Sequence, residues 1–286
     1  MRWLKSLFGQ RKPTEDPQVA ARIRQEADWQ RLLADWPYPL RLVPGAQAAA
    51  VWQDEAAIGA REGFSPIIIT PGTPQLPKEP ADEADTPIEA PDAIVDAYVR
   101  SLIYENWALK RPGVTSQFRN ALPEEVAAAL ASNADYANGG AYAYEAAAFE
   151  NTTEIPPPPA EHLTFESLRS HELNGPFPQL AITRLPVAES WRAALLFQFG
   201  GWNSAPGPKE VAAFARRWKQ LHGANIACIT DDTLELAVEH PPTTFEAAKR
   251  LAQEHMLLCG EGLADVDLNY YIATLRSRRS WFFWWD

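Results

Sequence analysis

Two stretches of the C-terminal third decide the fold: Ala193-Ala-Leu-Leu-Phe-Gln-Phe-Gly-Gly-Trp-Asn203 and Ile226-Ala-Cys-Ile-Thr-Asp-Asp-Thr-Leu-Glu-Leu-Ala-Val-Glu239. Each begins with a short apolar run that is typical of a buried strand. Between them, apolar residues recur at helical spacing from Val211 to Leu221, and Gly223 is well suited to end that helix. Strand, helix and strand in this order predict a right-handed βαβ unit whose two strands are parallel neighbours.

The second stretch continues into an antiparallel hairpin. Residues 231–233 have the composition of a turn, and apolar and polar side chains alternate over 234–239, which predicts a strand with one buried face. A helix is expected up to Leu258, another over 265–275, and a strand or an aromatic plug over 281–285. We therefore expect an α/β (mixed α+β) fold, with a mixed sheet that contains a βαβ unit, an antiparallel hairpin and flanking helices.

The first half of the chain also contains alternating elements. We expect helices over 19–36 and 46–61, strands over 40–43 and 67–70, and two more helices between 92 and 132. Proline-rich segments suggest the boundaries between the parts of the chain. Residues 71–91 are predicted to form an acidic Pro-rich loop, and Pro156–Pro159 a polyproline II spacer. The predicted parts are a flexible or amphipathic N-terminus (1–18), an N-terminal α/β region (19–155), a Pro-rich connector (156–190) and a C-terminal domain (191–286).

Composition limits the classes of partner. The 286 residues carry a net charge of −11, which repels nucleic acid and favours encounters with basic partners. No stripe of Lys and Arg with interleaved aromatic residues occurs, so we expect no nucleic-acid binding. Cys228 and Cys259 lie in apolar stretches, where cysteine behaves as a small hydrophobic residue. We therefore expect both to be reduced thiols in the core of a cytosolic protein. With no apolar run long enough to span a bilayer, we expect a cytoplasmic protein.

The first twelve residues have an amphipathic pattern. As a helix they would group Trp3, Leu4, Leu7 and Phe8 on one side, with basic residues beside them. This pattern leaves two alternatives open, a contact with a membrane surface and a frayed or docked terminus. We favour the second, because so short a helix is marginal in water.

Short motifs follow one another in a fixed order from Trp191 to Asp286. They are Phe199-Gly-Gly-Trp-Asn203, Arg217-Trp218, Gly223-Ala224, Thr230-Asp-Asp232, Leu234-Glu-Leu236, Pro241-Pro242 and Trp281-Phe-Phe-Trp-Trp-Asp286. In order and spacing they resemble the bacterial family known as domain of unknown function 4253, although Ala205 stands where family members often have cysteine. The resemblance implies a bacterial protein and a C-terminal module, but no reaction.

The candidate binding residues occupy two corners of the predicted βαβ unit. They are Gly200, Gly201, Trp202 and Asn203 after the first strand, and Asp231 and Asp232 after the second. Ligands bind outside the carboxyl ends of parallel strands, so we expect the two corners to lie side by side. Trp202 offers a flat apolar wall, Asn203 both donates and accepts, and the paired carboxylates can serve as acid and base. The alternative is structural, with Trp202 in the core and the aspartates in a simple turn.

Signatures of catalysis are missing from the sequence. It has no Gly-rich phosphate loop, no nucleophile elbow and no histidines at metal-ligand spacing, so we expect neither a metal nor a cofactor. The leading hypothesis is a non-catalytic binding protein for a protein partner, a basic one given the net charge, and an immunity-like role is one concrete form of it. The alternative is a hydrolase or transferase for a small polar substrate, with Asp231 or Asp232 as base and Asn203 orienting the substrate. The sequence does not decide whether the protein is an enzyme.

Overall fold

The computed structural model describes residues 17–76, 93–94, 149, 151–160, 162–170, 174–203, 205–263 and 266–286. The chain divides into two units, Met1–Pro37 and Tyr38–Asp286. The first unit contains helix α1 (Pro17–Asp35), close to the helix expected over 19–36. Three predictions fall outside the described residues: the amphipathic segment 1–12, the acidic loop from residue 77 onward, and all but residues 93–94 of the helices expected between 92 and 132.

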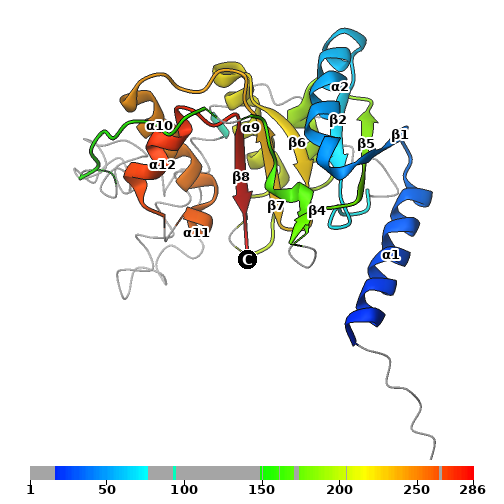
Figure 1. Ribbon diagram of the computed structural model, residues 1–286. Helices are drawn as coiled ribbons and strands as arrows, with labels where there is room; N and C mark the ends of the chain where they lie inside the picture. Colours follow the sequence, from blue (N-terminus) through cyan, green and yellow to red (C-terminus); the bar gives the residue numbers. More distant parts are fainter. Residues whose placement is uncertain are drawn as a thin grey trace, which may run out of the picture. The chain divides into compact units, whose positions relative to one another are not determined.

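A six-stranded mixed sheet runs through the second unit (Figure 1). The strands lie in the order β1 (Leu40–Pro44), β5 (Gln179–Leu185), β2 (Ser65–Ile69), β6 (Asn225–Ile229), β7 (Thr233–Ala237) and β8 (Ser280–Trp284). Only β2 and β6 are parallel neighbours, and the other adjacent pairs are antiparallel. Consequently β1, β2, β6 and β8 all end at one edge of the sheet, the carboxyl edge, where β5 and β7 begin.

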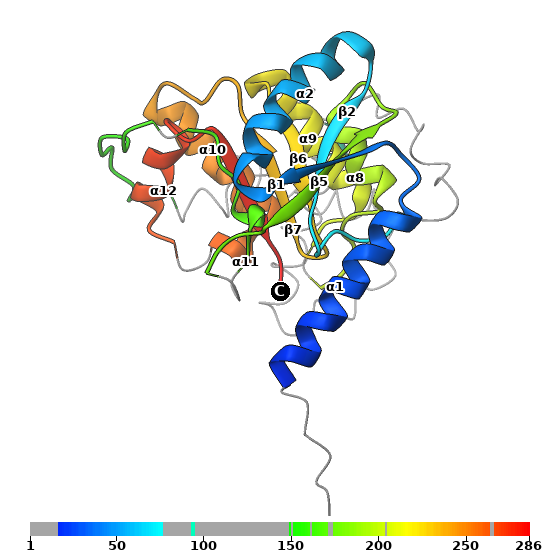
Figure 2. The ribbon, with the colours of Figure 1, turned by 45° about the vertical axis from the view of Figure 1, so that its right-hand side comes forward.

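Helices and one irregular segment cover the two faces of the sheet (Figures 1 and 2). On the first face, Trp52 of α2 (Ala48–Glu62) donates its indole N–H to Pro66 O at 2.9 Å and packs edge-on against Phe165. On the second face, Trp218 of α9 (Pro208–His222) stacks on Phe283 of β8 with ring centroids 5.4 Å apart. Three more helices follow on this side: α8 (Ala193–Leu196), α10 (Phe245–Leu258) and α12 (Leu268–Leu275).

A neutral histidine lies within the aromatic core of the second face. His255 of α10 is fully buried, and its ring centroid lies 4.7 to 4.8 Å from those of Trp218, Trp281 and Phe283. Its Nδ1 is 2.7 Å from the hydroxyl of Tyr271 on α12. Burial among these rings holds the pKa of His255 well below its usual value. The imidazole therefore packs as one more aromatic ring that joins α9, α10, α12 and β8.

The predicted βαβ unit is wrong in its first strand. Residues Ala193–Leu196 form the short helix α8 after a 3-10 turn over Ser190–Arg192. All four α8 side chains are buried, and a short apolar run that is buried on all sides fits a helical turn as well as a strand. The parallel neighbour of β6 is instead β2, where Ile68 pairs with Cys228.

Strand β5 lies inside the segment that was predicted to be a Pro-rich connector, 156–190. It pairs with β1 on one side and β2 on the other, so strands from both halves of the chain share one sheet. Strand β7, for which one buried face was predicted, is buried at all five positions. Strand β5 is covered on both faces and therefore lacks the clear alternation of a half-buried strand. Strand β7 does alternate, but its polar residue Glu235 is itself buried.

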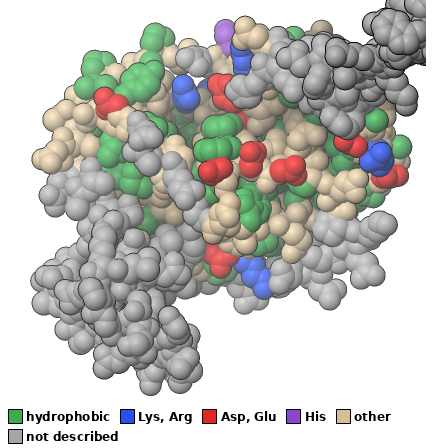
Figure 3. Space-filling view, turned by 90° about the horizontal axis from the view of Figure 1, so that it is seen from below, with side chains coloured by type: hydrophobic (Ala, Val, Ile, Leu, Met, Phe, Trp, Pro, Cys, Tyr) green, Lys and Arg blue, Asp and Glu red, His purple; other side chains and the backbone are tan. Residues whose placement is uncertain are grey.

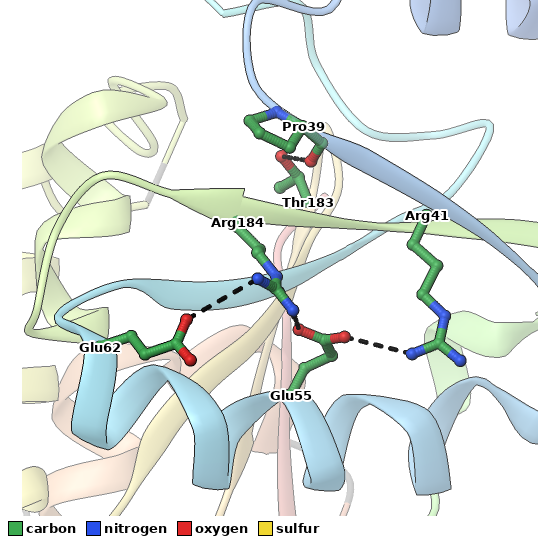
Figure 4. A network of polar contacts seen from close by, with 6 residues as sticks. All are labelled: Pro39, Arg41, Glu55, Glu62, Thr183 and Arg184. Atoms are coloured by element: carbon green, nitrogen blue, oxygen red, sulfur yellow. Dashed lines mark hydrogen bonds and ion pairs between the residues drawn. The ribbon is translucent and has the colours of Figure 1, made fainter.

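An ion-pair network connects α2 to β1 and β5 (Figure 4). Glu55 of α2 is 3% exposed, and its two carboxylate oxygens accept from Arg184 Nε at 2.8 Å and from Arg41 Nη1 at 3.2 Å. Arg184 also lies 3.9 Å from Glu62 and 4.5 Å above the ring of Phe64. Since Arg41 is on β1 and Arg184 on β5, one carboxylate holds the helix across two neighbouring strands.

We expect Glu55→Gln to lower the free energy of unfolding by about 1–3 kcal/mol. The amide presents a donor to one of the two arginines and leaves buried hydrogen-bonding capacity unsatisfied. Urea denaturation at neutral pH measures the loss. Glu62→Gln is the matched control on the same helix, and it should change stability by less than about 0.5 kcal/mol because this contact is long and exposed. Equal effects of the two substitutions would contradict the role given to Glu55.

Candidate functional site

A hollow of about 640 Å³ opens at the carboxyl edge of the sheet. Its lining comes from the segments after β2 and β6, from β8, and from the small hairpin of β3 (Arg169–Ser170) and β4 (Gly175–Pro176) with the turn before it. Ligands of open sheets bind outside the carboxyl ends of parallel strands, and this hollow occupies that place for β2 and β6. We call it the carboxyl-edge hollow.

Two exposed aromatic side chains form the apolar part of this hollow. Phe282 and Trp284 of β8 are 41% and 40% exposed, whereas Trp281 and Phe283, which point to the other face, are 2% exposed. Figure 3, which views the molecule from below, shows hydrophobic patches next to several acidic side chains on the described surface. The two rings lie two residues apart on the same face of the strand and together form one apolar patch on the surface.

Asp232 lies at the junction of three strands. Its Oδ1 accepts from the hydroxyls of Thr230 at 3.0 Å and Thr233 at 2.9 Å, and its Oδ2 accepts from the indole N–H of Trp284 at 3.0 Å. Its main-chain oxygen accepts from Trp285 N at 3.1 Å. The carboxylate therefore attaches the turn between β6 and β7 to the end of β8, while the residue also lines the hollow.

Asp231 lies in the same turn in a different environment. Its main-chain N–H donates to Gly72 O at 2.8 Å, which joins the turn to the segment after β2. The residue is exposed on the surface, but partial burial of its carboxyl group and the neighbouring charge of Asp232 raise its pKa. The carboxyl group of Asp231 therefore ionises less readily than that of a free aspartate.

The Gly-Gly-Trp-Asn loop packs mainly against residues that lie close to it in the sequence. Gly200 has φ +105°, and a Cβ at this position would overlap the carbonyl oxygen of Pro206. Glycine at position 200 therefore allows the loop to fold closely onto the segment at Pro206. Trp202 is half-buried, with its ring edge-on to Phe199 at 5.1 Å, and Asn203 donates its side-chain N–H to the main-chain oxygen of Asp286.

The C-terminal residues bring the two predicted corners together. Asp232 contacts Trp284 and Trp285, and Asn203 contacts Asp286. The link is the end of β8, not a pair of neighbouring parallel strands as predicted. Of the six residues predicted from the sequence, Asp232 lines the carboxyl-edge hollow, and the other five are not among the residues that line it.

Sequence reasoning missed the wall of the hollow, which includes Glu166, Ser167 and Arg169. These residues belong to the segment interpreted as a connector, and the turn dipeptide Asn174-Gly175 is the local signal of a hairpin there. Phe282 and Trp284 had a signal as well. In a strand over 281–285, consecutive aromatic residues point to opposite faces of the sheet. If one set packs in the core, the position of the other set on the opposite face has to be explained separately.

A buried carboxylate holds this wall on β7. Glu235 is 1% exposed, and its two oxygens accept the main-chain N–H groups of Glu166 at 2.8 Å and Ser167 at 2.9 Å. Burial raises the pKa of Glu235 to about 7, in spite of these hydrogen bonds. Burial also raises the pKa of Cys228, which pairs with Glu235 in the sheet, so this thiol stays protonated.

Protonation of Glu235 makes stability depend on pH. The folded protein holds this proton up to a pKa of about 7, against an ordinary value of 4.5, so the stabilisation is present at acid pH and is lost as the pH rises through 7. We expect the stability of the unsubstituted protein to fall relative to Glu235→Gln by about 2–3 kcal/mol between about pH 5 and pH 8. Urea denaturation across this range tests it, with exposed Glu246→Gln as control. Parallel pH curves for the protein and Glu235→Gln would refute the shift.

The described residues provide no metal centre. Among them, no three His, Cys, Asp or Glu side chains are grouped so that they could hold a metal ion. Neither Cys228 nor Cys259 forms a disulfide. No helix in this part of the chain has the length and apolar character needed to cross a membrane.

A family model matches the C-terminal part of the chain. The match covers residues 181–286, from within β5 to the last residue, and the family is described as Domain of unknown function (DUF4253). Both predicted corners and all of β8 lie in this range. Neither a curated protein nor a solved structure matches the chain. The resemblance inferred from the C-terminal motifs is therefore confirmed over residues 181–286, the part of the chain that the family model matches.

Proposed function

We propose that the protein is a non-catalytic binding module that holds a basic segment of a protein partner in the carboxyl-edge hollow. The observation that carries this proposal is the exposure of Phe282 and Trp284, 41% and 40%, beside a hollow large enough for a side chain. The faces of aromatic rings attract Lys and Arg side chains, and aromatic anchors near a pocket commonly dominate binding between proteins.

The charges around the hollow support a basic partner. Glu166 and Asp232 line it, and Asp231 lies in the adjoining turn, whereas Arg169 is the cation of the wall. The net charge of −11 for the whole chain adds long-range attraction for a basic protein and repulsion for nucleic acid.

Neutralisation of a basic toxin by an immunity-like protein is one concrete form of this function. Such a role would take place in the cytoplasm, which agrees with two cysteines that form no disulfide.

The aromatic pair gives a direct test with a defined probe, a short fluorescent peptide of alternating Arg and Ser residues. We expect Phe282→Ser to weaken its binding about fivefold to tenfold in fluorescence anisotropy, through the loss of a cation–π and apolar contact. Leu221→Ser removes a hydrophobic side chain of 54% exposure that does not line the hollow, and it should leave binding unchanged. A peptide of alternating Glu and Ser should not bind. Equal binding by both variants would exclude this hollow as the site.

A second candidate function, an enzyme acting on a small polar substrate, is favoured by the raised pKa of Asp231. An acid–base group works best when its pKa lies toward the working pH, and Asn203 at the neighbouring corner would orient the substrate. If this function holds, Asp231→Asn should abolish turnover of a panel of nitrophenyl esters and phosphates, and the rate should rise with pH to a plateau because the base is the ionised form. Glu246→Gln should keep full activity. An unsubstituted protein without turnover would rule out this reaction class.

A further inference from the structure

A second hollow, of about 480 Å³, lies at the opposite edge of the sheet, where β2 and β6 begin and β5 and β7 end. One wall is helix α2, and the opposite side is formed by residues after β5 and β7 together with Lys219 of α9. We call it the α2 hollow. Its volume lies within the range of small-molecule sites.

The base of the α2 hollow is apolar. Helix α2 presents the small residues Ala56 and Ala60 to it, and the apolar residues Trp52, Leu163 and Ala237, which pack together in the core of the first face, also line it. Small residues on this side of the helix keep the space open, and these apolar residues provide a surface that favours a hydrophobic group.

The polar groups at this base already have partners within the protein. Ser190 donates its hydroxyl to Asn225 Oδ1 at 3.2 Å and accepts from Ile226 N at 3.1 Å. The indole N–H of Trp52 donates to Pro66 O at 2.9 Å. A ligand group that enters the base therefore does not have to form hydrogen bonds with these atoms, and this suits an apolar side chain.

The rim of the hollow carries four charged residues, two of which neutralise each other. Lys219 Nζ lies 3.7 Å from Glu239 Oε1, and the same oxygen accepts from Asn225 Nδ2 at 3.2 Å. The other two, Arg279 and Glu189, form no ion pair with any residue in the described part of the chain. The rim thus offers one cation and one carboxylate to a ligand.

The backbone fixes both of these charged residues at the rim. Arg279 O accepts from Val238 N at 2.8 Å, and Glu189 O accepts from Arg192 N at 3.1 Å. Each residue therefore has an anchored main chain and a side chain that can turn toward a ligand.

We propose that the α2 hollow binds a free α-amino acid with a large apolar side chain. The side chain enters the apolar base between α2 and β6, the carboxylate binds Arg279, and the ammonium group binds Glu189. A rim with one free charge of each sign matches a zwitterion, and the apolar base selects its side chain. This site lies at the other edge of the sheet and does not depend on the function proposed for the carboxyl-edge hollow.

Three related probes separate the contributions of the ligand charges in calorimetric titrations of the full chain. L-phenylalanine carries both charges, 3-phenylpropanoate lacks the ammonium group, and 2-phenylethylamine lacks the carboxylate. We expect L-phenylalanine to bind and each of the other two to bind at least about tenfold more weakly. Equal affinity for L-phenylalanine and either analogue, or no binding of L-phenylalanine at low-millimolar concentration, would overturn the proposal.

Substitutions locate the binding at this hollow. Ala60→Leu fills it from the surface of α2, and Ala50→Leu adds the same side chain at an exposed position of the helix away from the lining. Both should fold, since leucine is a good helix former. We expect Ala60→Leu to abolish L-phenylalanine binding and Ala50→Leu to retain it. Unchanged binding by Ala60→Leu would overturn the proposal.

The proposed contact between the ligand carboxylate and Arg279 is tested with Arg279→Gln, which should weaken L-phenylalanine binding at least about tenfold. Its neighbour Arg278→Gln, which does not line the hollow, is the control and should bind normally. Phe282→Ser should also bind L-phenylalanine normally, so that failure at one hollow is distinguishable from failure at the other. Equal binding by Arg279→Gln and Arg278→Gln would overturn the role of Arg279.

Discussion

Strand β5 lies between β1 and β2, and its hydrogen bonds to both are the constraint on which the other features depend. The chain reaches this central position only after residues 162–170 have crossed the first face of the sheet. That segment therefore packs over β7, where the carboxylate of Glu235 accepts the N–H groups of Glu166 and Ser167. The wall of the carboxyl-edge hollow is a consequence of this route.

The two faces of β8 differ because of where this cover ends. On the second face, Trp281 and Phe283 pack with Trp218 and His255 in an aromatic cluster that joins α9 and α10 to the strand. On the first face, the segment 162–170 covers the sheet as far as β7. Phe282 and Trp284 of β8 therefore keep about two-fifths of their surface exposed. A single strand thus supplies both part of the core and the aromatic surface of the proposed binding site.

Several motif residues of the family domain have an evident structural role. Asp232 attaches the β6–β7 turn to β8, Asn203 contacts the last residue, and Gly200 lets its loop approach Pro206. Together they fasten the C-terminal strand at the edge of the sheet. Other motif residues, Phe282 and Trp284, face the hollow, and their exposure became evident only once β8 was placed in the sheet.

The amino-acid sequence by itself determined those elements that have a solvent-exposed side or a clear stop. The amphipathic pattern of α9 and its end at Gly223, which has φ +62°, are examples. Asp231 and Asp232 were placed correctly in a turn, and the family of the C-terminal domain followed from its motifs. Only the tertiary structure decided that Ala193–Leu196 is helical, that β5 is an interior strand of the sheet, and that β2 is the parallel partner of β6. Elements buried on all sides lose the periodicity that contact with water imposes, and strand neighbours far apart in the chain are chosen by packing, which no local pattern records.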